Sequence, residues 1–185
     1  ILTAATKVFA KKGFFNARIS DIAKEAKVAD GTIYLYFNNK HDILISIFEK
    51  EFGAINNQAL EILENETDAE AMLELFIANY LRAMKKNKFF ASVIQLELRQ
   101  TDKQIKDYRN TRFKEFVDII ASIIRLGQEQ SVFRPELNPD ILKRIIYGAL
   151  EETSLVWNVS LESNYSLEEI TSQFVDLILN GLKTR

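Results

Sequence analysis

Apolar residues recur at intervals of three and four along most of the chain, which is the spacing of an amphipathic α-helix. The first such stripe stops at Gly13, and glycine commonly follows the last residue of a helix because it tolerates a positive φ. The residues of this stripe are Ile1, Ala4, Ala5, Val8 and Phe9. We therefore predict a first helix that ends close to residue 13.

The next stripes are short. They predict helices over residues 19–26 and 31–37, joined by the link 27–30, and then a long helix over residues 40–64. Two short helices joined by a tight link form a helix-turn-helix, whose second helix enters the major groove of DNA. The pattern predicts a compact N-terminal unit of three short helices that contains this motif.

The remaining sequence also favours helices. Apolar stripes run around residues 73–84 and 113–124, and further helices are predicted over residues 139–159 and 167–182. Only two prolines and six glycines interrupt the whole sequence. The predicted fold class is all-α, with an N-terminal three-helix helix-turn-helix unit followed by a C-terminal helical bundle.

The amino-acid composition limits the kinds of metal site and catalytic site that the chain can form. The sequence has no cysteine and a single histidine, His41, which leaves most metal sites and His-dependent catalytic sites without members. We therefore expect no metal, no cofactor and no enzymatic activity. The apolar runs are shorter than the roughly 18 to 20 residues that span a bilayer, and lysines interrupt residues 1–13 too early for a signal peptide. A cytoplasmic protein without a membrane partner is expected.

Charge is spread unevenly along the chain. Residues 1–50 hold 8 Lys and Arg against 5 Asp and Glu, whereas residues 51–185 hold 16 against 21. An anionic partner such as DNA is therefore repelled least by the first quarter of the chain.

The helical period divides the side chains of residues 19–37 into two faces. Small or branched apolar residues face inward, with Ala23 at the expected crossing of the two helices. The outward face holds Asp30, Thr32, Tyr34, Leu35 and Tyr36. Hydroxyl and aromatic groups at the start of a recognition helix can reach base edges, thymine methyls and phosphate oxygens, so double-stranded operator DNA is the expected partner.

The string DIAKEAKVADGTIYLYFNNKHDIL, preceded by AATKVFAKKGF, closely resembles the DNA-binding signature of the TetR-type repressor family over about residues 1–45. The resemblance implies a homodimer of helical chains, with residues 1–45 as the DNA-binding domain and residues 46–185 as the ligand-binding and dimerisation domain. It also implies DNA contacts for Thr32, Tyr34, Tyr36 and Lys40.

The chain departs from the family pattern at several positions. Ala17 and Arg18 stand where the family usually has two hydroxyl residues, and Lys27 replaces a turn glycine. We expect Arg18 to supply a phosphate contact, Lys27 to adopt a left-handed conformation, and Asp30 to cap the recognition helix in place of Ala29. The predicted DNA-binding residues are Arg18, Ser20, Lys27, Asp30, Gly31, Thr32, Tyr34, Tyr36 and Lys40.

The C-terminal body combines aromatic residues with a basic helix face. Arg109 and Arg112 continue the apolar line from Ile105 to Phe113 and Phe116, which is the geometry expected at the mouth of an apolar pocket. An acyl-coenzyme A would place its tail among the aromatic rings and its phosphates against the arginines. The predicted ligand-binding residues are Phe76, Tyr80, Phe89, Phe90, Arg99, Arg109, Arg112, Phe113, Phe116, Tyr147 and Trp157.

Other interpretations of the body stay open. The aromatic residues are also what a helical core requires, and the arginines also suit a solvated helix face. The stretches VIQLELRQ and IIYGALEETSLVW are similar to the acyl-CoA-responsive regulators of fatty acid degradation within the TetR-type family, over about residues 90–160. The alternatives are a multidrug-sensing repressor of an efflux gene, or a helical lipid-binding protein or enzyme.

The last two predicted helices carry small residues where two helices can approach closely. Gly148 and Ala149, with Leu177, Ile178 and Gly181, mark these surfaces, and pairing with a second copy would build a four-helix interface. The adjacent Glu151 and Glu152 point about 100° apart on a helix, so we expect a core or interface hydrogen-bond role there and not an acid/base pair.

Overall fold

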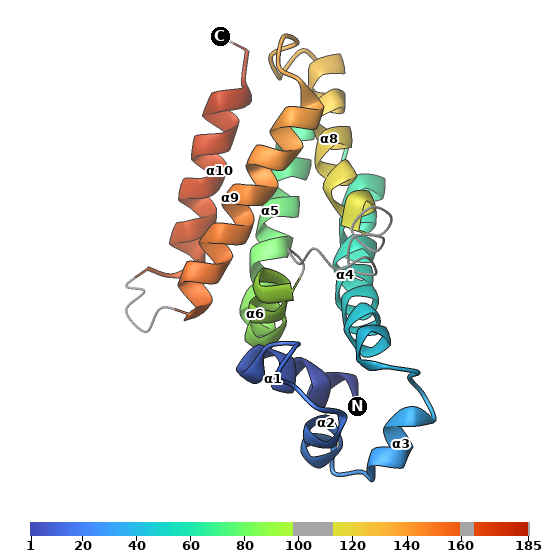
Figure 1. Cartoon of the computed structure of the whole chain (residues 1–185). Coiled ribbons are helices and arrows are strands. Elements are labelled where there is room, and N and C mark those ends of the chain that lie inside the picture. Colours follow the sequence, from blue (N-terminus) through green and yellow to red (C-terminus); the bar gives the residue numbers. More distant parts are fainter. Residues whose placement is uncertain (98–112, 160–164, 185) are drawn as a thin grey trace. The chain divides into compact units, whose positions relative to one another are not determined.

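The computed structural model describes residues 1–97, 113–159 and 165–184, with the side chains of residues 95–97 and 155–159 left out (Figure 1). The regular elements of these ranges are α-helices, and Phe133 and Lys183 form an isolated β-bridge. The all-α prediction is confirmed. None of the described helices combines the length and the apolarity that crossing a membrane needs.

The chain divides into two compact units. Unit 1 comprises Ile1–Gly53 and Asn87–Phe113, and unit 2 comprises Ala54–Lys86 and Lys114–Arg185. The long helix α4, Lys40–Asn65, passes from the first unit into the second. The helix predicted over residues 40–64 is therefore confirmed, and it is shared by both units.

Unit 1 begins with α1, Leu2–Lys12, and α2, Ile19–Ala26. α1 ends as predicted, because Gly13 has a φ of 71° and its amide donates to the carbonyl of Phe9. The prediction of a left-handed Lys27 is also confirmed, since its φ of 57° and ψ of 43° end α2.

Helix α3, Asp30–Tyr34, is shorter than the predicted 31–37. The amides of Leu35 and Tyr36 donate to carbonyls three residues back, at 3.3 and 3.1 Å, so the chain tightens into a turn after Tyr34. The prediction that Asp30 caps this helix is wrong. The N-cap position is Ala29, whose methyl group cannot accept a hydrogen bond, and Asp30 is already helical.

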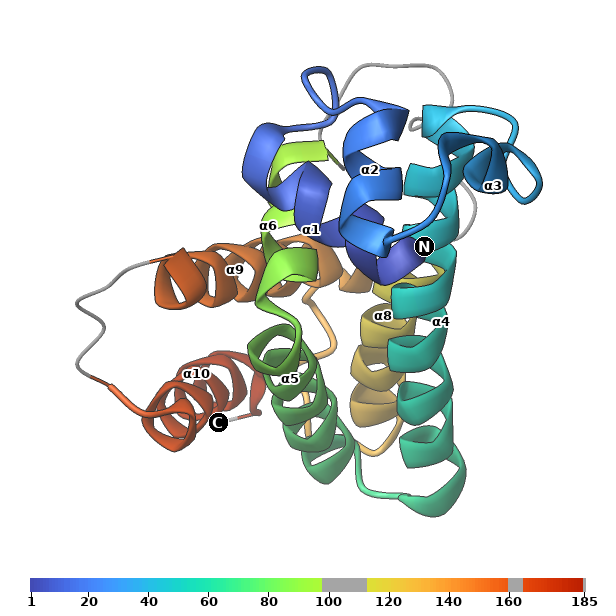
Figure 2. The same cartoon turned by 90° about the horizontal axis from the view of Figure 1, so that it is seen from below.

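Helix α6, Lys88–Glu97, completes the regular part of unit 1 and packs on α1 (Figure 2). No helix was predicted here. The Asn87 side chain accepts a hydrogen bond from the amide of Phe90 at 3.1 Å and donates to Glu51 of α4 at 3.1 Å. One asparagine thus caps α6 and also joins it to α4.

Unit 2 contains α5, Ala69–Lys86, α8, Lys114–Glu129, α9, Pro139–Val159, and α10, Leu167–Leu182. α8 packs along α9, and α5 contacts α8, α9 and α10. The predicted bounds of α9 and α10 are confirmed. α10 begins with a reciprocal capping box, in which Ser166 accepts from the amide of Glu169 at 3.1 Å and Glu169 accepts from the amide of Ser166 at 2.7 Å.

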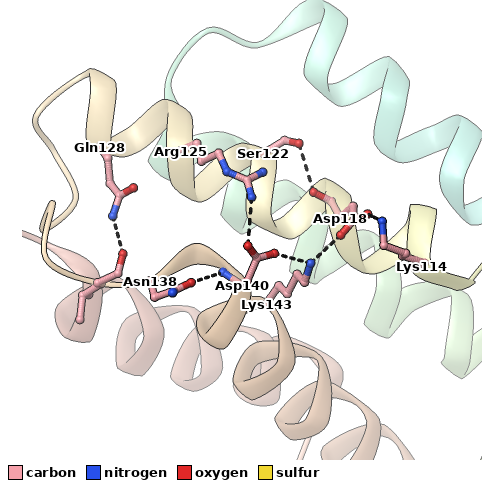
Figure 3. Close-up of polar contacts among 9 residues, drawn as sticks. Lys114, Asp118, Ser122, Arg125, Gln128, Asn138, Asp140 and Lys143 are labelled. Carbon is pink, nitrogen blue, oxygen red and sulfur yellow. Dashed lines mark hydrogen bonds and ion pairs between the residues drawn. The ribbon is translucent and has the colours of Figure 1, made fainter. Parts of the chain in front are cut away.

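A buried lysine joins α8 to α9 (Figure 3). The Lys143 ammonium lies 2.6 Å from Asp118 of α8 and 2.5 Å from Asp140 of α9, and only 8% of its side chain is exposed. Hydrogen bonds to Lys143 lower the pKa of both carboxyl groups, and the two carboxylates raise the pKa of Lys143.

Replacing Lys143 with methionine is expected to lower the free energy of unfolding at pH 7 by about 1.5–3 kcal/mol, the range for hydrogen bonds to charged groups. A carboxyl group with a lowered pKa stabilises the fold above its unfolded pKa, near 3.8, and this contribution is lost as the pH falls through the folded value. Urea unfolding followed by circular dichroism should therefore show the two proteins converging at acid pH. The exposed Arg144→Met is the control, and a deficit that does not change with pH would contradict this assignment.

Candidate functional site

Large side chains project into solvent from α3 and the turn that follows it. Tyr34 is 59% exposed, Leu35 79% and Tyr36 68%. Ile33 of α3 is fully buried, so its neighbour Tyr34, about 100° further round the helix, points away from the protein. Leu35 and Tyr36 project from the turn after α3. Exposed aromatic and aliphatic side chains gathered on one short segment mark a binding surface.

Gly31 lies on the same short helix and is exposed. A Cβ placed on this residue would meet no atom within 4 Å among the residues that the structure describes. Glycine in a helix costs about 1 kcal/mol relative to alanine, and here no neighbour within the chain requires it. An external partner that approaches the backbone closely would require it.

The charges on α2 also favour an anionic partner. Arg18, Ser20 and Lys27 are exposed at its two ends. The acidic residues of α2 are paired with lysines of α1, Asp21 with Lys12 and Glu25 with Lys7, each at 2.7 Å, and these lysines lower the pKa of both carboxyl groups. The acidic groups are thus partly neutralised from within, while the cations at the helix ends face solvent.

Lys40 is placed differently from the other predicted DNA-binding residues. Its ammonium donates to the carbonyl oxygens of Phe15 at 3.1 Å and Ala17 at 3.0 Å, and it lies 4.5 Å from the centre of the Phe14 ring. Asp30 is exposed and Thr32 is half-buried.

The predicted ligand-binding residues fall into separate groups. In unit 1, the Phe52 ring lies 5.5 Å from Phe90 and 5.6 Å from Phe113. Phe89 points away from this group, because it is 39% exposed and its ring lies 6.0 Å from the ammonium of Lys7.

In unit 2, a second aromatic group surrounds Phe116. Its ring stacks on Phe76 at 5.5 Å and on Tyr80 at 5.6 Å, and Tyr147 meets it edge-on at 6.0 Å. These four rings come from α5, α8 and α9, and all are buried.

Polar groups that the sequence analysis missed lie in the same unit. Asn79, on α5 among apolar neighbours, is 8% exposed, and its amide nitrogen has no hydrogen-bond partner among the described residues. Glu151 and Ser154 are also buried, as expected for Glu151. Burial raises the pKa of Tyr80, and the charge of Glu151 raises it further. The signal available in the sequence was an amide interrupting an apolar stripe.

The structure does not describe the predicted basic face. Arg99, Arg109 and Arg112, and the side chain of Trp157, are outside the described residues. Their role stays a prediction.

The last two helices present apolar side chains to solvent. On α9, Ile141 and Ile145 are 58% and 55% exposed, and on α10 Leu177 is 73% exposed. Leu177, Phe174 and Ile170 line a groove of about 520 Å³. A Cβ at Gly148 or Gly181 would meet no atom of the described residues within 4 Å, so within this part of the chain both positions leave room for a close approach. This arrangement suits a homodimer formed through α9 and α10.

Comparison with known proteins finds matches along nearly the whole chain. Residues 1–47 match the model described as bacterial regulatory proteins, tetR family, and residues 48–181 match the C-terminal region of YsiA-like proteins. The fatty acid metabolism regulator protein of Bacillus subtilis is 32% identical over 185 residues, which cover 100% of this chain and 95% of that protein.

Two solved structures of bacterial regulators are similar to this chain over nearly its whole length. The regulator FadR from Bacillus subtilis, in complex with stearoyl-CoA, has a TM-score of 0.88 and 32% identity, covering 97% of this chain and 96% of the other. The fatty acid degradation regulator FadR from Bacillus halodurans has a TM-score of 0.87 and 33% identity, covering 98% and 97%. The exposed recognition surface, the helical body and these full-length similarities together establish that the chain belongs to the tetR family of bacterial regulatory proteins.

Proposed function

We propose that this chain is a homodimeric transcriptional repressor of fatty acid metabolism genes that acts in the cytoplasm, binds operator DNA through α2 and α3, and is released by long-chain acyl-CoA. The observation that carries the DNA-binding part is the exposed surface formed by Tyr34 of α3 and by Leu35 and Tyr36 of the turn that follows it.

The chemistry of this surface suits duplex DNA. Tyrosine and threonine hydroxyls hydrogen-bond to base edges and phosphates, and an exposed leucine can contact a thymine methyl. Arg18 and Lys27 would neutralise phosphates, and Gly31 would let the DNA backbone approach α3 closely. An enzyme is not needed to explain any of these features.

Support for the effector comes from the relative whose structure holds stearoyl-CoA and whose sequence matches over nearly the whole chain. An acyl tail gains about 0.8 kcal/mol for each methylene group that leaves water, so an aromatic group within one unit, either the one around Phe52 or the one around Phe116, is a suitable surrounding for it. Arg99, Arg109 and Arg112 are the predicted partners of the phosphates.

Release requires a difference in affinity. The acyl-CoA must bind the form that cannot hold the operator more tightly than the form that can, and a coupling of about 1–3 kcal/mol changes operator affinity roughly 5- to 150-fold. α4 is the natural connection, because this one helix runs from Lys40 in the DNA-binding unit to Asn65 in the other.

The test is fluorescence anisotropy with DNA from the intergenic region upstream of the chain's own gene, at fixed salt. We expect stearoyl-CoA to release the DNA, whereas free coenzyme A and stearate should not. Failure to bind any such DNA would contradict the repressor, and binding that stearoyl-CoA leaves unchanged would contradict the effector. Release by a hydrophobic drug instead would favour the multidrug-sensing alternative.

The arginines can be tested in the same assay. Arg109→Ala with Arg112→Ala should abolish the response to stearoyl-CoA while operator affinity in its absence stays the same. A response of unchanged strength would leave these arginines as surface charges.

A further inference from the structure

The buried amide of Asn79, on α5, has a hydrogen-bond donor that the described part of the chain does not use. The side chain is 8% exposed, and its nitrogen, Nδ2, has no hydrogen-bond partner among the described residues. A buried donor that leaves water without gaining an acceptor makes the folded chain less stable. A ligand that brings an acceptor oxygen to this nitrogen would remove that penalty.

The residues around Asn79 on its helix face are apolar. Met72 and Phe76 lie seven and three residues before it, and Ala83 lies four residues after it, so they share one face of α5. Met72 is 4% exposed and Phe76 is 1% exposed, and the Phe76 ring stacks on Phe116 of α8 at 5.5 Å. The donor therefore lies within an apolar stripe, one helical turn from a ring of the aromatic group around Phe116.

A buried water molecule is a poor partner for a donor in these surroundings. Such a water typically makes about three hydrogen bonds, to several polar groups around it. The stripe supplies the amide of Asn79, and its other three side chains are apolar. A carbonyl oxygen carried by a ligand can be satisfied by this one donor, and an apolar chain attached to the carbonyl can lie against the other side chains.

The stripe can also make room for such a chain. Methionine is unbranched and has three rotatable bonds, so the Met72 side chain can change its shape at little cost. On the other side of Asn79, the half-buried Ala83 has only a methyl group. An apolar tail along this face would displace a flexible side chain, while Phe76 keeps its stacking on Phe116.

We propose that Asn79 recognises the carbonyl oxygen of an acyl thioester, with its amide nitrogen donating to that oxygen and the acyl tail lying along the stripe of Met72, Phe76 and Ala83. This inference rests on the proposed function, because it names a specificity residue for the acyl-CoA effector. A hydrocarbon chain alone leaves the amide unpaired, whereas a thioester pairs it. The effector is thus distinguished by the polar group at the head of its tail as well as by the tail.

Two ligands that differ in this oxygen test the contact. Stearoyl-CoA and its thioether analogue S-octadecyl-CoA share the phosphates and a chain of the same length, but the thioether lacks the carbonyl oxygen. The measured quantity is the ligand concentration that releases half of the bound operator DNA, expressed as the ratio of thioether to thioester. This ratio cancels any change in operator affinity between variants.

For the wild type we expect a ratio of roughly ten, the upper part of the range that one hydrogen bond contributes. For Asn79→Leu we expect a ratio of about one, because neither ligand finds a donor there. A wild-type ratio of about one, or a ratio that Asn79→Leu leaves unchanged, would overturn the proposal. The wild-type ratio carries the test by itself if the variant does not fold.

The stability of the free protein is an independent readout. Leucine has nearly the same branched outline as asparagine and no polar atom to leave unpaired, so Asn79→Leu should raise the melting temperature by about 2–4 °C. A lower melting temperature would show that the amide already has a partner in the free protein and would overturn the proposal.

Asn87→Leu is the matched control. The Asn87 side chain donates to Glu51 and accepts from the amide of Phe90, each at 3.1 Å. The same substitution should therefore lower the melting temperature here and keep the wild-type ratio of the two ligands.

Failure of the proposed function has a different signature. A wild type that binds no operator DNA would contradict the repressor, and operator binding that neither ligand affects would contradict the effector, and either result would overturn the Asn79 contact as well. Equal release by the two ligands would contradict the Asn79 contact alone.

Discussion

Gly31→Ala is expected to weaken operator binding by about 5- to 150-fold, although it makes the free protein slightly more stable. The added methyl group meets no atom within 4 Å in the described part of the chain, so it strains no contact there. Alanine in a helix is favoured over glycine by about 1 kcal/mol. In the complex, the methyl group would press on the DNA backbone, and such overpacking typically costs about 1–3 kcal/mol, which corresponds to the stated decrease in affinity.

The two effects are measured separately, by thermal unfolding of the free protein and by fluorescence anisotropy with operator DNA. Gly53→Ala is the matched control, because Gly53 also lies in a helix and a Cβ there meets nothing within 4 Å. It should raise the melting temperature without changing operator affinity. If Gly31→Ala binds as tightly as the wild type, the DNA backbone does not approach α3 at this residue.

Phe116→Ala is expected to lower the free energy of unfolding by about 3–5 kcal/mol, the usual range for removing a buried aromatic ring. Phe116 has no exposed surface and contacts Phe76, Tyr80 and Tyr147 from two other helices. Urea unfolding measures the change, with the half-exposed Phe89→Ala as a control that should cost much less.

This experiment also separates two roles of the aromatic group. A ring that belongs to the permanent core is needed whether or not an effector is bound. If Phe116→Ala abolished the response to stearoyl-CoA while the free energy of unfolding stayed the same, the ring would line the ligand site and the core assignment would be wrong.

Much of the fold could be predicted because helices follow local rules. The period of apolar residues located α2, α9 and α10 to the residue, and Gly13 and Lys27 ended their helices as their local backbone required. The outward direction of Tyr34 followed from the inward-facing Ile33 beside it, since adjacent residues on a helix point about 100° apart. Tyr36 comes three residues after Ile33 and would share its face on a continuing helix, but it is exposed in the turn that follows α3.

Other features depended on contacts between residues far apart in the chain. An apolar stripe shows that a helix face is buried but not which element covers it, so α6 could not be assigned to α1 from sequence. For the same reason, aromatic residues predicted as one set were divided between the two units.

The sequence by itself determined the all-α fold, the helix-turn-helix and its outward face, because each depends on residues within a few turns of one another. Only the tertiary structure decided where the polar groups of long side chains go. Lys40 resembled a phosphate contact by its place in the motif, yet its ammonium meets two carbonyl groups and an aromatic ring from the 14–17 loop. A flexible four-carbon stem can reach several partners, and the packed loop supplied those acceptors within reach of the ammonium.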